Sequence, residues 1–193
     1  MKKLLNLFII TIVLGFSFMS CQTKEKPEPT CHIYGTMESD EWNGKRIFLV
    51  PMFGPQDAEH VDSVVIENGK FEFTPDTMEM KVIKLDYHFR AGTQELLVVS
   101  EPGDIHVLIG KNSTSAGTPQ NDSLQVWKDG LAKYNKKYNE LRAKAMETKD
   151  ESILMTEGKA IQQELRAFNL QMKENMKEGI FYEFLQKMYP SEK

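Results

Sequence analysis

Hydrophobic and polar residues follow two different patterns along the chain. Between residues 31 and 109, short runs of β-branched and aromatic residues are separated by turn residues about every 8 to 12 positions. From Thr118 onward, apolar residues recur at alternating intervals of three and four. We therefore predict an α+β fold, in which an antiparallel β-sandwich or partial barrel is followed by an antiparallel helical hairpin.

The first of these patterns predicts six or seven strands, at residues 33–37, 45–51, 61–67, 70–74, 81–90, 94–100 and 105–109. Within 81–90, apolar and polar residues alternate, so one face should meet a core and the other water. Asn68-Gly69 predicts a tight hairpin turn, because Asn and Gly tolerate positive φ. Glu101-Pro102-Gly103-Asp104 predicts another hairpin. Its shared apolar face should comprise Leu97, Val99, Ile105, Val107 and Ile109.

The second pattern predicts two long helices and a short last segment. Thr118-Pro119 is a favourable helix start, because a Thr hydroxyl can cap free amides and Pro fits the first helical position. Thr148-Lys149-Asp150-Glu151 matches a capping box for the next helix. Gly179 should end that helix before the aromatic segment 180–189, which by default docks on its own chain and otherwise on another chain. The heptad seams comprise Leu124, Trp127, Leu131, Tyr134, Tyr138, Leu141 and Ala145, then Leu154, Ile161, Leu165, Phe168 and Met172.

The first residues resemble a bacterial lipoprotein signal peptide. Lys2 and Lys3 precede an apolar stretch, 4–19, which has fewer than the ~20 apolar residues that a membrane span needs. Phe18-Met19-Ser20-Cys21 resembles a lipobox, with Phe and Met where Leu and a small or β-branched residue are usual. The resemblance implies cleavage after residue 20 and acylation of Cys21 by chains such as palmitate, which would attach the protein to a membrane. An ordinary secretory signal is the alternative.

The segment that follows has the composition of a flexible tether. Residues 22–30 contain four charged residues, two prolines and no large apolar residue, so they cannot bury enough surface to fold. Gln22, at the second position after cleavage, is similar to the sorting signals of Gram-negative lipoproteins and implies the outer membrane. We therefore expect a protein of the cell envelope, on either the periplasmic or the surface face.

Composition narrows the range of functions. The 193 residues are 40% hydrophobic and 27% charged, with a formal net charge of −4, which is typical of a folded globular protein. A mildly acidic chain provides no basic surface for phosphates, so we expect no nucleic-acid partner. The sequence contains no ligand-spaced metal motif and no nucleophile motif. We therefore expect no metal, no cofactor and no catalytic residue, although a hydrolase activity stays open.

The chain has two cysteines and no C-x-x-C. If Cys21 is lipidated, Cys31 is the remaining thiol, so the chain can neither form an internal disulfide nor run a dithiol exchange cycle alone. We expect Cys31 to be a partly buried, inert free thiol, as free cysteines usually are. The alternative is a mixed disulfide with a partner.

Several turn motifs, taken in order, resemble a known family. They are Gly35-Thr36, 44–49, Asp62-Ser63-Val64 with 68–73, 101–105 and 117–122. Over about residues 31–126 they resemble the β-domain of unknown function that precedes a thioredoxin-like domain in thiol-disulfide oxidoreductase lipoproteins of Bacteroidetes. In those relatives a helical segment follows, and then a redox domain whose C-x-x-C does not occur in this sequence. The resemblance implies an association with redox proteins, but it transfers no oxidoreductase activity and no catalytic residue.

Each candidate site has a structural alternative. Glu101 and Asp104 could form a carboxylate pair for acid–base chemistry, but Pro102-Gly103 between them favours a tight turn. Trp127 and the seam tyrosines could form a ligand platform, but heptad spacing favours a core. The four histidines, His32, His60, His88 and His106, are not spaced as metal ligands.

One candidate modification site also emerges. Asp62-Ser63-Val64, Asp76-Thr77-Met78 and Asp122-Ser123-Leu124 resemble the three-residue O-glycosylation motif of the Bacteroidetes lineage. Thr77 is the best placed of the three, because its motif is expected in a loop.

These observations predict four segments and one main function. We expect a lipoprotein signal peptide at 1–20, a lipidated cysteine and tether at 21–30, a β-sandwich at 31–117, and a helical hairpin with a C-terminal helix at 118–193. The expected function is that of a lipid-anchored, non-catalytic binding or accessory module associated with thiol-disulfide redox proteins. The alternative is a stand-alone lipoprotein that binds carbohydrate or another surface ligand through an exposed sheet face.

Overall fold

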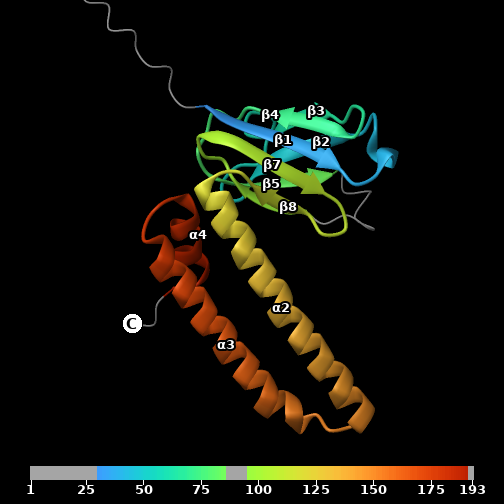
Figure 1. Ribbon diagram of the computed structural model, residues 1–193, viewed down its shortest axis with the longest axis vertical. Helices are drawn as coiled ribbons and strands as arrows, with labels where there is room; N and C mark the ends of the chain where they lie inside the picture. Colours follow the sequence, from blue (N-terminus) through green and yellow to red (C-terminus); the bar gives the residue numbers. More distant parts are fainter. Residues whose placement is uncertain (1–29, 86–94, 191–193) are drawn as a thin grey trace, which may run out of the picture.

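The computed structural model describes residues 30–85 and 95–190, which form a β-sandwich and a helical arm. Figure 1 shows the sandwich at one end, with two long helices running away from it. The strands are β1 (Cys31–Met37), β2 (Arg46–Pro51), β3 (Asp62–Val65), β4 (Lys70–Phe73), β5 (Met80–Leu85), β6 (Leu96–Val99), β7 (Gly103–Ile109) and β8 (Thr114–Ala116). The helices are the 3-10 helix η1 (Asp40–Trp42) and the α-helices α2 (Pro119–Thr148), α3 (Ser152–Met176) and α4 (Ile180–Met188).

The described strands form two four-stranded sheets that share one core. One sheet has the order β4-β1-β7-β8 and the other the order β3-β2-β5-β6. Neighbouring strands are antiparallel except for β1 and β7, which run parallel along their whole length. Neither sheet closes on itself, so the predicted α+β fold is confirmed as a sandwich and not as a closed barrel.

The chain crosses between the two sheets at a tight turn. Asn68 and Gly69 have φ angles of 52° and 70°, so the predicted turn is confirmed. Glu67 and Lys70 exchange backbone hydrogen bonds of 2.9 and 3.0 Å. The ladder ends there, because β3 and β4 belong to different sheets. This turn therefore joins the layers of the sandwich instead of closing a longer hairpin.

The predicted hairpin at Glu101-Pro102-Gly103-Asp104 is wrong. β6 pairs with β5, whereas β7 pairs with β1 and β8, so this turn also joins the two sheets. The predicted face of Leu97 and Val99 is wrong as well, because they pack toward the helices. Leu96 and Val98 enter the sandwich core in their place. Both faces of β6 are covered, so its sequence lacks the alternation that would distinguish them.

The predicted strand at 81–90 begins as β5, and residues 86–90 lie outside the described residues. Ile83 enters the sandwich core as predicted. The opposite face does not meet water at the start of the strand, because Met80 packs against the helices. Lys81 lies on the same side of β5 as Ile83 and is only 3% exposed.

Helices α2 and α3 form the predicted antiparallel hairpin (Figure 1). The predicted seams lie between them or against the sandwich. Their buried members are Leu124, Trp127, Leu141, Ala145 and Met172, and the others are partly buried. The seam assignment is therefore confirmed.

A second core lies where the helices meet the sandwich, and we call it the junction core. Phe181 and Leu185 of α4 are fully buried in it, so the C-terminal segment docks on its own chain. The Trp127 ring packs edge-on against Phe181 and Phe184, with centroid distances of 5.9 and 5.6 Å. Its Nε1 donates to Oδ1 of Asn169 at 2.8 Å. Trp127 is therefore a core residue and not part of an open ligand platform.

The N-terminal cap of α2 differs from the prediction. Thr118 occupies the N-cap position, but its hydroxyl accepts from the side chain of Asn121 at 2.9 Å and not from a backbone N–H of the helix. Instead, Oε1 of Glu101 accepts from the backbone N–H groups of Gln120 at 2.8 Å and Asn121 at 3.2 Å. A carboxylate is a stronger acceptor than a hydroxyl and is favoured by the helix dipole, so it displaces Thr118 from this role.

The predicted capping box of α3 does not form. Thr148 still belongs to α2, and its hydroxyl donates to the carbonyl oxygen of Lys144. The N-cap residue of α3 is Glu151, and Oδ1 of the preceding Asp150 accepts from the backbone N–H of Ser152 at 2.9 Å. The capping-box pattern failed because α2 continues through Thr148, the first residue of the pattern.

Candidate functional site

The predicted lipid anchor lies outside the described residues. The signal peptide at 1–20, Cys21 and residues 22–29 of the tether belong to this part of the chain. The lipidation of Cys21 therefore stays a prediction. Among the residues that the structure describes, no helix is long and apolar enough to cross a bilayer.

Cys31 is a buried free thiol at the start of β1. Its side chain is 1% exposed and forms part of the sandwich core. Burial raises the pKa of this thiol from 9.0 to about 11. The thiolate is the species that attacks disulfides, so the folded chain holds Cys31 in its unreactive form. Of the two alternatives for Cys31, the geometry favours the inert thiol.

Glu101 and Asp104 do not assemble into a carboxylate pair. Glu101 is 7% exposed and is directed at the start of α2, whereas Asp104 is exposed on β7. The second carboxylate oxygen of Glu101 accepts from Nε2 of Gln120 at 3.0 Å. Oε1 of Gln120 then accepts from the backbone N–H of Phe181 at 2.9 Å. Glu101 therefore ties the β6–β7 turn, α2 and α4 together, which is a structural role.

The described histidines do not gather at one place. His32 and His106 flank Tyr34 on the outer face of the β4-β1-β7-β8 sheet, with ring centroids 6.1 and 5.6 Å from that of Tyr34. His60 lies in the loop between β2 and β3, and His88 lies outside the described residues. Within 30–85 and 95–190, no three His, Cys, Asp or Glu side chains are placed to hold a metal ion.

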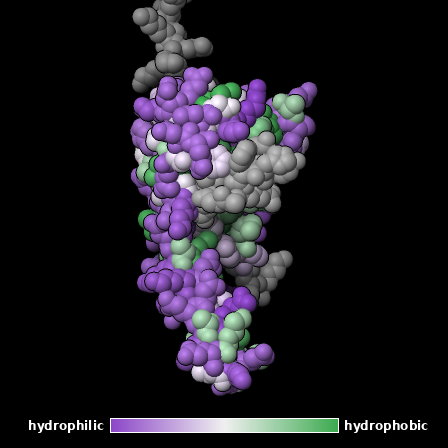
Figure 2. Space-filling model, turned by 90° about the vertical axis from the view of Figure 1, so that its right-hand side faces the viewer, coloured by the Kyte–Doolittle hydropathy of each residue, from purple (hydrophilic) through white to green (hydrophobic). Residues whose placement is uncertain are grey.

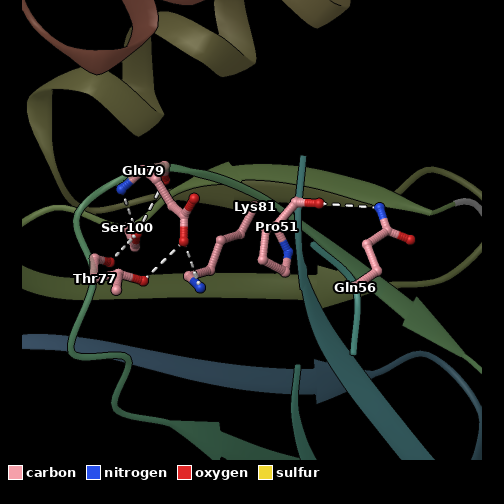
Figure 3. A network of polar contacts seen from close by, with 6 residues as sticks. All are labelled: Pro51, Gln56, Thr77, Glu79, Lys81 and Ser100. Atoms are coloured by element: carbon pink, nitrogen blue, oxygen red, sulfur yellow. Dashed lines mark hydrogen bonds and ion pairs between the residues drawn. The ribbon is translucent and has the colours of Figure 1, made fainter. Parts of the chain in front are cut away.

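Thr77 lies in an exposed loop between β4 and β5, as its motif predicts. Its hydroxyl donates to Oε1 of Glu79 at 2.8 Å, and the same oxygen is paired with Nζ of Lys81 at 3.0 Å (Figure 3). Ser100 Oγ braces the loop by donating to the carbonyl oxygen of Thr77 at 2.6 Å. A glycan on Thr77 would remove its bond to Glu79 but leave the Glu79–Lys81 pair. Glycosylation of Thr77 stays a prediction.

A polar cavity of about 320 Å³ lies between α2 and the edge strand β8. Lys128 of α2 lines it, and its Nζ donates to Oγ of Ser115 at 3.2 Å and to the carbonyl oxygen of Leu97 at 3.5 Å. Beside it, Nε2 of Gln125 donates to Oδ1 of Asp129 at 2.8 Å. We call this hollow the Lys128 cavity. Its wall also includes Glu95, Asn112, Thr114, Leu131 and Asn135.

The environment of Lys128 is unusual for a lysine. Burial lowers the pKa of its ammonium group from 10.5 to about 8, which the nearby charge of Asp129 partly opposes. Both hydrogen-bond partners of the ammonium are neutral oxygens. A shifted ionisable group in the wall of a cavity indicates a candidate functional site.

Sequence reasoning missed the Lys128 cavity. Lys128 follows Leu124 by four residues and precedes Leu131 by three, so it lies on the helix face that carries the apolar seam. A lysine on that face was the signal that could have found it. The polar residues around it come from three separate segments, and their assembly depends on the fold.

The far end of the α2–α3 hairpin exposes two methionines. Met146, near the end of α2, is 71% exposed, and Met155, near the start of α3, is 78% exposed. A hollow of about 530 Å³ lies beside Met146 and is also lined by Arg142 and Leu154. Figure 2 shows a pale green patch near the lower end of the arm, with hydrophilic surface around it. We call residues 142–155 the hairpin tip.

Comparison with known proteins gives one match. Residues 31–124 match the family model of a domain of unknown function, DUF4369. The match begins with β1 and ends in the first turns of α2, so it spans both sheets of the sandwich. It confirms the predicted relationship of this segment to a domain of unknown function. No curated protein and no solved structure matches the chain.

Proposed function

We propose that this chain, whose residues 31–124 match the DUF4369 family model, is a lipid-anchored binding module that works beside a separate thiol-disulfide oxidoreductase in the bacterial cell envelope. The observation that carries the proposal is the hairpin tip. Met146 and Met155 stand exposed at the end of an arm that extends away from the sandwich. Flexible thioether side chains suit an adaptable protein contact.

The contact with the redox protein is non-covalent. Cys31 is buried, and its raised pKa suppresses the thiolate that a mixed disulfide requires. The described part of the chain therefore offers no exposed thiol, since Cys31 is its single cysteine. The partner supplies the C-x-x-C chemistry, and this chain contributes position and recognition.

The anchor of this module is Cys21. The lipobox-like residues 18–21 and the polar composition of residues 22–30 support this anchor. Two or more acyl chains give stable membrane attachment, at about 0.8 kcal/mol for each buried methylene. A Cys21→Ala variant should lose palmitate labelling and leave the membrane fraction. Labelling that persists in this variant would contradict the anchor.

The protein partnership is tested by purification from envelopes. The wild-type protein should capture a C-x-x-C protein in near-stoichiometric amount, identified by mass spectrometry after thiol trapping. The double variant Met146→Asp, Met155→Asp should lose it, because two charges at the tip oppose an apolar contact. Met188→Asp is the matched control, since Met188 is 46% exposed on α4 and lies away from the tip. Capture that survives the double variant, or the absence of a C-x-x-C partner from the wild type, would overturn the proposal.

A second candidate function is recognition of a carbohydrate or another surface ligand. It is favoured by the Lys128 cavity, where an ammonium group, amides and hydroxyls line one concave site of about 320 Å³. The cavity lies at the edge of the sandwich, apart from the hairpin tip, so both functions can coexist in one chain.

A further inference from the structure

We infer that the Lys128 cavity binds a neutral saccharide, held by Lys128, Asn135 and the carboxylate of Asp129. This inference deepens the second candidate function by naming the ligand class and its site. It is independent of the protein contact proposed for the hairpin tip, because the two sites share no lining residue.

The charges around the cavity favour an uncharged ligand. Its ionisable side chains are Glu95 from the start of β6 and Lys128 and Asp129 from α2. One lysine and two acidic residues give the lining a formal charge of −1. A phosphate or carboxylate would meet one positive and two negative groups. A neutral polyol meets no such repulsion and can use both signs as hydrogen-bond partners.

The hydrogen-bonding groups match hydroxyls, which both donate and accept. Ser115 and Leu97 use two of the three N–H donors of the Lys128 ammonium, so one remains for a ligand oxygen. Gln125 holds one oxygen of Asp129, which leaves the other as an acceptor for a ligand hydroxyl. The side-chain amide of Asn135 lines the same cavity and makes no hydrogen bond to another described residue.

The remaining wall fits the apolar side of a sugar ring. Leu131 and Ala132 lie one helical turn beyond Lys128 and line the cavity with the polar groups. A pyranose ring presents C–H groups on its faces and hydroxyls at its edge, so it needs an apolar wall beside directed polar groups. The volume of about 320 Å³ is at the lower end of the about 300–1,000 Å³ range of ligand pockets, which favours one or two sugar units.

The experiment uses the full-length, lipidated protein in detergent. Glucose, galactose, mannose, N-acetylglucosamine and lactose are titrated by calorimetry, with glucuronate and inorganic phosphate as anionic probes. At least one neutral sugar should bind, and glucuronate should bind at least tenfold more weakly than the corresponding neutral sugar. An array of immobilised glycans then distinguishes a free sugar from the terminal unit of a chain.

Variants locate the site. Asn135→Leu removes an exposed amide from the cavity wall and should weaken binding at least tenfold, as should Lys128→Met. Asn139→Leu is the matched control, because Asn139 is also exposed on α2 but lies outside the cavity, so affinity should be unchanged. Bound sugar should also slow acylation of Lys128 relative to the other lysines, measured by mass spectrometry.

Three outcomes would overturn the inference. They are the absence of binding to any neutral sugar, tighter binding of glucuronate or phosphate, and sugar binding that Asn135→Leu and Lys128→Met leave unchanged. None of these results bears on capture of a redox partner through Met146 and Met155, so each of the two proposals can be refuted without refuting the other.

Discussion

Replacing Glu101 with Gln tests whether one buried carboxylate joins the sandwich to the helical arm. Its Oε1 accepts from two backbone N–H groups at the start of α2, those of Gln120 and Asn121. Its Oε2 accepts from the side chain of Gln120 at 3.0 Å, and Gln120 in turn accepts from the backbone of Phe181. The variant keeps the shape of the side chain but removes its charge and one acceptor.

The expected loss follows from these contacts. An uncharged oxygen caps the helix less strongly, and removing the favourable charge–dipole interaction costs about 0.3–1 kcal/mol. The amide group that replaces Oε2 of Glu101 would face the amide of Gln120, so one charge-assisted hydrogen bond, worth about 1.5–3 kcal/mol, is lost. Gln120 cannot rotate to compensate without releasing the N–H of Phe181. We expect Glu101→Gln to lower the free energy of unfolding by about 2–4 kcal/mol.

The assay is urea unfolding of the unlipidated Cys21→Ala protein, followed by circular dichroism at a helical band and by tryptophan fluorescence. Asp104→Asn is the matched control, because Asp104 is an exposed carboxylate from the same turn and should change stability by no more than about 0.5 kcal/mol. A loss below about 0.5 kcal/mol for Glu101→Gln, or an equal loss for both variants, would refute the argument.

Three further predictions concern other buried or partly buried groups. Cys31 should resist thiol reagents until the protein unfolds, and fast labelling of the folded protein would contradict this. Because the folded state favours the neutral thiol, the contribution of Cys31 to stability should be lost as pH rises from about 9 toward 11. Burial disfavours the charged ammonium of Lys128 in the folded state, and Asp129 opposes this only in part. As pH rises from about 8 toward 10.5, the wild type should therefore gain stability relative to Lys128→Met, on the order of 1 kcal/mol. Urea unfolding that gives parallel curves of stability against pH for the two proteins would refute this prediction. Trp127→Phe should cost about 1–3 kcal/mol in urea unfolding, because it leaves the buried Asn169 oxygen without its donor; an unchanged midpoint would show that this bond contributes nothing.

Local signals in the sequence were sufficient for the elements but not for their partners. The positive φ values of Asn68 and Gly69 confirm the turn that their residue types predict. Nothing in those two residues shows that the chain changes sheets there, because pairing depends on strands far away in sequence. Strand β6 is apolar on both faces, so its sequence does not indicate which face meets the sandwich core. Leu96 and Val98 enter that core because the helices cover Leu97 and Val99.

For the candidate sites too, the sequence predicted local features but not contacts between distant residues. The sequence correctly placed Thr77 in an exposed loop and Trp127 in a core seam. It could not assign Glu101 to the cap of α2, because cap and helix are 19 residues apart. The Lys128 cavity was missed for a related reason: its polar groups come from α2, from the β7–β8 region and from the start of β6, and only the fold brings them together.

The tight turns that carry the chain from one sheet to the other also bear on how the protein folds. At Asn68-Gly69 and at Pro102-Gly103, neighbouring strands do not pair with each other, so β1 must find β4 and β7 across long stretches of chain. Closing such loops costs entropy before any contact forms, which makes a fold of this topology slow. The α2–α3 hairpin needs only contacts between consecutive helices. The arm can therefore form before the sandwich, and Glu101 can complete the cap of α2 only when both sheets are in place.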